Sequence, residues 1–133
     1  MVAQVDRDGR QVDLTLKLPS GWRNASDISW RATSWDLRRI ATGGLVLETL
    51  PDQERPAATP PEGMALRVKH VGQYGEHAAG KHAGFQKGDV LVSFDNRQDL
   101  MTETDLLAYV LQTPVKDRPV RVTVLRGERR LQL

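Results

Sequence analysis

The sequence predicts an α+β fold, in which a small, strongly bent sheet is capped by one long and one short helix. Two observations predict it. Segments that alternate apolar and polar residues recur along the second half of the chain, and one longer segment near residues 102–112 has the spacing of a helix. Glycine and proline separate these segments. The 133 residues suffice for one ordinary domain with a short appendage.

The first predicted element is a hairpin. Residues 2–5 and 11–17 flank Asp8-Gly9, a pair that suits a tight turn with positive φ. Within the second arm, Val12, Leu14 and Leu16 alternate with polar residues, which is the period of a half-buried strand.

The next segment, residues 22–39, holds all three tryptophans, Trp22, Trp30 and Trp35. Its rhythm is neither helical nor stranded, so we expect irregular chain with a short strand or turn. Two roles are open for it: a cap on one end of the domain, or an interface to a neighbouring domain or partner, where Trp and Arg are enriched. We therefore divide the chain into a hairpin and connector (1–39) and a domain (40–133).

The domain is expected to run in the order strand, strand, strand, helix, strand, strand. Thr102 is a candidate N-cap with an acid, Asp105, three residues on, and Pro114 ends that helix near Gln112. In the third strand, Val90, Val92 and Phe94 are expected to share one face. The first four strands are expected at 44–50, 66–71, 90–94 and 120–124. A turn at 126–128 leads to the last strand, which ends at residue 133. A proline-rich loop at 51–63 is expected to hold one helical turn near residues 52–54.

A faint internal echo links the two ends of the chain. Residues 5–14 align without a gap on residues 124–133, with few identities. Two readings stay open: coincidence between two hairpins, or a chain that begins with the last hairpin of a preceding, similar domain.

Composition limits the classes of function. No apolar run approaches the roughly 20 residues of a membrane span, and polar residues follow Met1, so we expect neither membrane insertion nor a signal peptide in this chain. With no cysteine, disulfides and thiolate metal sites are excluded. The net charge of +2 is far from the one-sided excess of a nucleic-acid binder. No aromatic residue interleaves with the arginines of the final hairpin, Arg126, Arg129 and Arg130, so nucleic acid is not an expected partner.

The most informative stretch is residues 83–96, Ala-Gly-Phe-Gln-Lys-Gly-Asp-Val-Leu-Val-Ser-Phe-Asp-Asn. It resembles the signature of the PDZ domain, and the later elements follow in the order of that family over about residues 40–133. Gly84 and Gly88 permit tight turns around Phe85, which is expected to plug the core. Asp89 is expected to accept hydrogen bonds from turn amides.

The resemblance implies a peptide-binding site. In PDZ domains a Gly-apolar-Gly-apolar loop presents amides to the carboxylate of a C-terminal peptide, which pairs as an extra strand between the following strand and the long helix. The matching loop here begins at Gly44, but the family's second glycine is Val46, which resists unusual φ/ψ. The expected peptide-binding residues are Gly44, Leu45, Val46, Leu47 and Thr49 of the loop and strand, the preceding Arg39, and Glu103, Leu107 and Val110 on one helix face.

The order of elements is similar to the bacterial, HtrA-like branch of the family. That likeness implies the regulatory, substrate-recognition domain of a periplasmic or other envelope serine protease of trypsin-like type, with an extended peptide or protein C-terminus as partner. Two alternatives stay open: an interaction or scaffold module of a non-protease envelope protein, or a degenerate PDZ domain that makes interdomain contacts only.

Catalysis and metal binding are the remaining alternatives. Ser93, His77 and Asp89 have no Gly-x-Ser-x-Gly context, so we expect no catalytic residue in this chain. His70, His77 and His82 follow spacings of no helical or finger pattern, so we expect no metal site and no cofactor.

Overall fold

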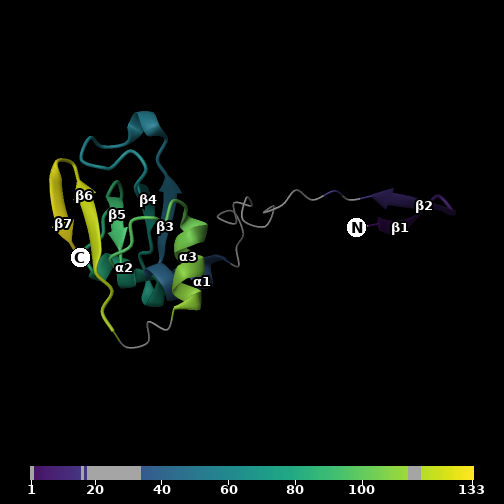
Figure 1. Cartoon of the computed structure of the whole chain (residues 1–133). Coiled ribbons are helices and arrows are strands. Elements are labelled where there is room, and N and C mark those ends of the chain that lie inside the picture. The colour runs from purple at the N-terminus through teal and green to yellow at the C-terminus, as the bar shows by residue number, and fades with distance from the viewer. Residues whose placement is uncertain (1, 16, 18–33, 114–117) are drawn as a thin grey trace.

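A computed structural model describes residues 2–15, 17, 34–113 and 118–133. Within them the chain is α+β, with a two-stranded and a five-stranded antiparallel sheet and three helices (Figure 1). The five strands are ordered β3-β4-β5-β6-β7, so β3 and β7 are the edges. The elements are β1 (Val2–Arg7), β2 (Arg10–Thr15), α1 (Ser34–Thr42), β3 (Leu45–Thr49), η1 (Asp52–Glu54), β4 (Leu66–Val71), η2 (Gly75–Ala78), α2 (Ala79–His82), β5 (Val90–Phe94), α3 (Glu103–Gln112), β6 (Val122–Arg126) and β7 (Arg129–Gln132).

The α+β class and the predicted order of elements after residue 44 are confirmed. β6 begins at Val122, two residues later than expected, and the short helical turn lies at Asp52–Glu54 as predicted. Thr102 caps α3 through a capping box, because its hydroxyl accepts the Asp105 amide while the Asp105 carboxylate accepts the Thr102 amide.

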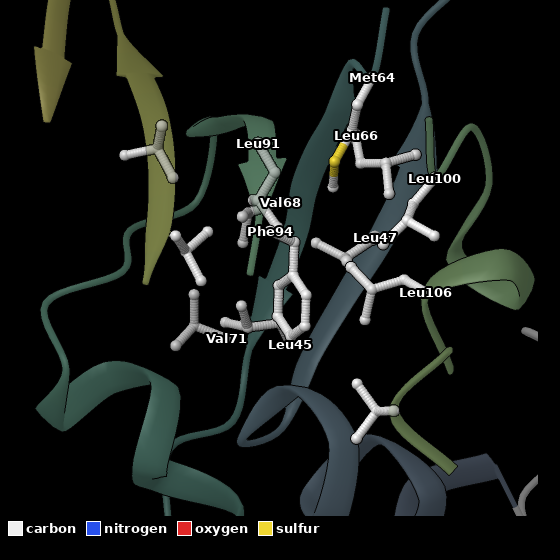
Figure 2. Packing of buried hydrophobic residues seen from close by; sticks show 13 residues of the cluster. Leu45, Leu47, Met64, Leu66, Val68, Val71, Leu91, Phe94, Leu100 and Leu106 are labelled. Carbon is white, nitrogen blue, oxygen red and sulfur yellow. The ribbon is translucent and has the colours of Figure 1, made fainter. Parts of the chain in front are cut away.

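The main core lies between the sheet and the helices (Figure 2). Its centre is made of buried leucine and valine side chains from β3, β4, β5, β6 and α3, among them Leu66, Leu106 and Val124, together with Met64 just before β4. A second cluster, Leu50, Ala65, Val90, Val92 and Leu125, covers the other face of the sheet.

The expectation that Val90, Val92 and Phe94 share one face is wrong. Val90 and Val92 belong to the second cluster, whereas Phe94 lies in the main core with Leu91. The pairing of β5 with β6 shifts register between Leu91 and Ser93, and such a bulge moves the following side chain to the opposite face.

The N-terminal hairpin β1–β2 has the predicted turn, since Asp8 and Gly9 have φ of 54° and 76° and Arg7 pairs with Arg10. The half-buried strand that its pattern predicted is wrong for the described residues. Val12 and Leu14 are 36% and 43% exposed, so no core covers them here. Leu16 lies outside the described residues.

Helix α1 corrects the expectation of irregular chain for residues 34–39, and it runs across the boundary expected at residue 39. Trp35 lies on this helix and is 39% exposed. Trp22 and Trp30 fall outside the described residues. Among the helices of the described ranges, none combines the length and apolar character that a bilayer crossing demands.

Candidate functional site

The turn that precedes β5 is built as its sequence predicts. Gly84 and Gly88 have φ of +99° and +95°, a region that favours glycine. Asp89 is almost completely buried and its Oδ2 accepts the Gln86 amide at 2.9 Å. The guanidinium of Arg126 closes on the same carboxylate, with Nε at 2.8 Å from Oδ1 and a terminal nitrogen at 2.8 Å from Oδ2. The turn is therefore anchored to the β6–β7 hairpin.

The loop before β3 is a helix end rather than an open cradle of amides. The Gly44 amide donates to the Arg38 carbonyl at 3.0 Å, and Gly43 has φ +64°, which together make a Schellman-type end for α1. A Cβ on Gly44 would lie 1.9 Å from the carbonyl oxygen of His77. Glycine is thus required at position 44 by close packing, and its amide is already used.

The free edge of β3 is covered by the chain's own side chains. The backbone amide and carbonyl groups of Leu45 and Leu47 face away from β4. The Gly44 carbonyl accepts the Gly72 amide and so faces β4, which turns the next residue, Leu45, to the other side. Val68, the partner of Leu47, donates its amide to the Asp89 carbonyl and not to β3. Thr42 Oγ1 lies 3.1 Å from the Leu45 carbonyl oxygen and 2.9 Å from that of Arg38, so its one hydroxyl proton is shared between these two acceptors. Glu103 Oε1 accepts the Leu47 amide at 2.9 Å. The expected strand-addition edge is therefore capped at two of its groups.

A buried ion pair holds this cap in place. Arg38 of α1 donates Nε to Glu103 Oε1 at 2.9 Å and a terminal nitrogen to Oε2 at 2.7 Å. The two side chains are 2% and 7% exposed. The same Arg38 also donates to Ser34 Oγ at 2.8 Å. Helix α1 is thus tied to the first residue of α3 across the end of β3.

The residues expected to wall a peptide groove are mostly enclosed. Leu45, Leu47, Leu107 and Val110 are between 2% and 8% exposed. Leu107 follows Glu103 by one turn of α3, on the side where α1 packs against that helix. These four side chains therefore offer little free surface to a peptide, and Arg38 and Thr42 of α1 already contact Glu103 and the Leu45 carbonyl beside them.

The outer expected residues take different places. Thr49 is exposed and donates its hydroxyl to the Met101 carbonyl at 2.9 Å, while Val46 is half-buried and pairs with His70 of β4. Arg39 forms ion pairs with Glu76 at 3.1 Å and Asp36 at 3.8 Å, so it is directed toward η2 and not to the β3 edge. The structure thus brings Glu103 to the β3 edge but not Arg39.

An apolar pocket of about 320 Å³ opens beside this region, at the end of the sheet. Two of the expected residues, Leu45 and Val110, line it. Ile40, Phe85 and Phe94 contribute further apolar surface. The remaining wall comes from the end of α1, from α2 and the residue after it, from β5, and from β6 with the segment before it: Ala41, Thr42, Gly43, Ala79, Gly80, Ala83, Leu91, Arg118, Val120 and Val122.

The charged residue at this pocket is Arg118. It donates to Asp95 Oδ1 at 2.8 Å, and Tyr109 donates its hydroxyl to Asp95 Oδ2 at 2.7 Å. These hydrogen bonds, Arg118 first, lower the pKa of Asp95 to about 2, and the bond to Asp95 raises the pKa of Tyr109. The pocket therefore has an apolar interior and a guanidinium beside it.

The histidines make no ligand cluster. Trp35 packs edge-on against His70 and His77, with ring centroids 5.8 and 6.2 Å away. His77 Nδ1 is buried, and no hydrogen-bond partner for it lies within the described ranges. No group of three or more His, Asp or Glu side chains that could hold a metal ion occurs in the part of the chain that the structure describes.

Sequence reasoning did not find Thr42 and Arg118 as parts of this region, and it assigned Arg38, with Arg39, to the carboxylate of a peptide and not to Glu103. A signal was present for Arg38, since Ser34 and Thr42 lie four residues to either side of it and give α1 a polar inner stripe. Arg118 lies beyond a stretch that carries no pattern. Comparisons with protein-family profiles, with curated proteins and with solved structures find no match to this chain.

Proposed function

We propose that this chain is a PDZ-like peptide-binding module that captures the end of an unstructured C-terminal peptide. The observation that carries the proposal is the apolar pocket of about 320 Å³ lined by Leu45 and Val110, which the sequence assigned to the binding region. A pocket of this size accepts one apolar side chain and excludes most water from it. The last residue of the peptide is the natural occupant.

The peptide's carboxylate has two groups to meet. The Leu45 amide faces away from β4 and begins the strand beside the pocket, and Arg118 contributes a guanidinium. The Gly44 amide is used by α1, and the Val46 amide faces β4. With so few donors, and with Arg118 shared with Asp95, we expect weak to moderate affinity.

Strand addition along β3 requires a change in the cap described above. When the last residue of the peptide fills the pocket, the residues that precede it can pair with β3 only if they replace Thr42 at the Leu45 carbonyl and Glu103 at the Leu47 amide. Opening this cap separates Arg38 from Glu103, which costs free energy. Terminal capture in the pocket is therefore the first step of the proposal, and pairing along β3 the second.

A second candidate function is contact between domains without peptide binding. The observation that favours it is the same enclosed Arg38–Glu103 pair, which leaves the β3 edge occupied. For either function, we propose that the chain is part of an envelope protein. If that protein is an HtrA-like serine protease, its catalytic residues lie outside these 133 residues.

The test is a chemical-shift titration with C-terminal peptides that end in valine, leucine or phenylalanine, each as free acid and as amide. We expect shifts at Gly43 to Leu47 and at Val110 with the free acids, and much weaker ones with the amides. Ala83→Phe, which fills the pocket from its exposed wall, should abolish the shifts. Leu111→Phe, on an exposed position of α3 outside the pocket, is the matched control and should bind normally.

The outcomes separate the two functions. Shifts that survive amidation mean that an internal segment is recognised. Equal binding by Ala83→Phe and the unchanged chain removes the pocket from the proposal. Arg38→Ala removes the arginine that holds the cap. If no peptide causes shifts in either the unchanged chain or this variant, peptide binding is ruled out and contact between domains is the function that remains.

A further inference from the structure

The hairpin β1–β2 presents an apolar face that no described residue covers. Strand alternation places Ala3 and Val5 on the same face as Val12 and Leu14, and the pairs Ala3 with Leu14 and Val5 with Val12 face each other across the two strands. The opposite face carries Gln4, Asp6, Gln11 and Asp13 in the corresponding pairs. An isolated two-stranded sheet is marginally stable in water, so this face needs a partner.

The hairpin β6–β7 has the same design. In both, two residues make the turn: Asp8-Gly9 between Arg7 and Arg10, and Gly127-Glu128 between Arg126 and Arg129. When residues 5–14 are aligned on 124–133, the turns coincide and the cross-strand pairs coincide as well. Val5 with Val12 corresponds to Val124 with Leu131.

The identities between the two hairpins fall on one face only. They are Val5 and Val124, Arg7 and Arg126, Arg10 and Arg129, and Leu14 and Leu133. Positions on the other face, such as Asp6 and Leu125, differ. A coincidence between two generic hairpins would scatter the identities over both faces, because the turn does not distinguish them.

In β6–β7 the shared face is the one that touches the core. Val122 and Val124 are buried in the main cluster, and Leu131 and Leu133 pack against it. Arg126 continues this face and closes on Asp89, while it also donates to the Gly84 carbonyl at 2.8 Å. Each residue of this set has its counterpart in the exposed face of β1–β2.

We propose that β1–β2 is the closing hairpin of a second body that has the fold of residues 34–133, and that it docks on that body as β6–β7 docks here. Its apolar face covers the core of that body beside a β5-like strand. The charges fit the same assignment. Arg7 occupies the position of Arg126, so the second body is expected to have a buried carboxylate, like Asp89, at the start of its β5-like strand.

One difference between the two hairpins, on the face away from the core, adds a property of the second body. Leu125 is buried in the second cluster, but its counterpart Asp6 is polar and accepts the Gly9 amide at 3.0 Å. A body closed by β1–β2 therefore has no apolar second layer at that point. Its sheet is covered on one face and exposed to water on the other.

The experiment is a hairpin graft in the full chain. Residues 3–14 replace residues 122–133, with leucine kept at position 125, so that the face described above meets the core in register. The control graft carries residues 4–15 in the same place, again with leucine at 125. That shift by one residue puts glutamine, two aspartates and threonine at the four core positions. Urea unfolding and amide spectra of both grafts are compared with the unchanged chain.

We expect the in-register graft to unfold in one cooperative transition and to retain the dispersed spectrum, with a slowly exchanging Nε–H signal from the arginine at 126. The control graft should lose both. A version of the graft with valine at 122 restores the methyl groups that Ala3 lacks relative to Val122 and should raise the midpoint. If the in-register graft, with or without this valine, behaves as the control does, the proposal is wrong.

A second arm tests whether the occupant is another copy of the chain. Sedimentation of the unchanged chain and of Leu14→Asp is measured over a range of concentrations. We expect both to be monomeric, because a copy of this chain already carries β6–β7 in that place. If the unchanged chain is a dimer and Leu14→Asp is a monomer, the proposal is wrong, and two β1–β2 hairpins pair face to face instead.

Discussion

Two arginine–carboxylate pairs hold different parts of the five-stranded sheet, one at the β3 edge and one between β5 and β6. At the β3 edge Arg38 holds Glu103, which also accepts the Leu47 amide. At the start of β5, Arg126 of β6 holds Asp89, which also accepts the Gln86 amide. Arg38 is 2% exposed, whereas Arg126 is 26% exposed. Water can replace the second arginine but not the first, so the β3 edge opens only by moving α1 as a unit.

Two glycines give the largest expected contrast between these two regions. Gly44 and Gly88 both have positive φ, but a Cβ at 44 meets the His77 carbonyl oxygen at 1.9 Å, while a Cβ at 88 meets no atom within 4 Å. Gly44→Ala should destabilise the fold by more than about 4 kcal/mol. Gly88→Ala should cost about 1–2 kcal/mol, from backbone strain alone. Urea denaturation of both variants measures this contrast, and equal losses would contradict it.

The buried pair gives the next effect. Arg38→Ala leaves the Glu103 carboxylate enclosed without its cation, which should cost about 3–5 kcal/mol in the free energy of unfolding. Chemical denaturation measures the loss.

The control is the double variant Arg38→Met with Glu103→Gln. It removes both charges and keeps a side-chain oxygen for the Leu47 amide, so it should recover most of the lost stability. A double variant as unstable as Arg38→Ala would mean that shape, and not charge, holds α1 in place.

Arg126→Ala should lower the melting temperature less than Arg38→Ala does. Asp89 keeps the Gln86 amide as a donor, and water reaches the space that a partly exposed arginine leaves. Arg126→Lys, which keeps the charge but not the two-pronged contact, should fall between the unchanged chain and Arg126→Ala. Thermal unfolding of the three variants in one buffer gives the ranking, and a larger drop for Arg126→Ala would reverse the comparison.

The smallest expected effect is a dependence on pH at the apolar pocket. Because Arg118 and Tyr109 lower the pKa of Asp95 to about 2 from an ordinary value near 3.8, the ionised form is favoured by folding. The stability that it contributes is complete above about pH 4 and is lost as the pH falls toward 2. Urea midpoints between pH 2 and 5 for the chain and for Asp95→Asn should converge at the acid end. Parallel curves would mean that Asp95 does not titrate there.

Most of the turns and helix ends were predictable because their signals are local. Asp8-Gly9, the Thr102 to Asp105 capping box and the glycines around Phe85 each fix a turn or an end within a few residues. The bulge in β5 was not predictable, because pairing with β6 produces it and the alternation of Val90 to Phe94 reads as regular.

The candidate site was predictable only in part. Leu45, Val110 and Glu103 do meet near the β3 edge, which the register of strand and helix indicated. The cap by α1 was missed because the basic residues before the loop were expected to meet the carboxylate of a peptide, whereas Arg38 meets a carboxylate of the chain itself. The burial of Arg38 depends on Glu103, which lies 65 residues away along the chain. The polar stripe of Ser34, Arg38 and Thr42 marks one face of α1, but it does not identify the partner of that face.

That separation of 65 residues also has a consequence for the kinetics of folding. Closing so long a loop costs entropy before any contact compensates it, so the docking of α1 on α3 belongs to the last part of the folding reaction. Loss of the pair should therefore accelerate unfolding and leave the folding rate nearly unchanged. Until α1 docks, β3 exposes an unpaired edge to other chains, and for that interval slow folding and aggregation compete for the same strand.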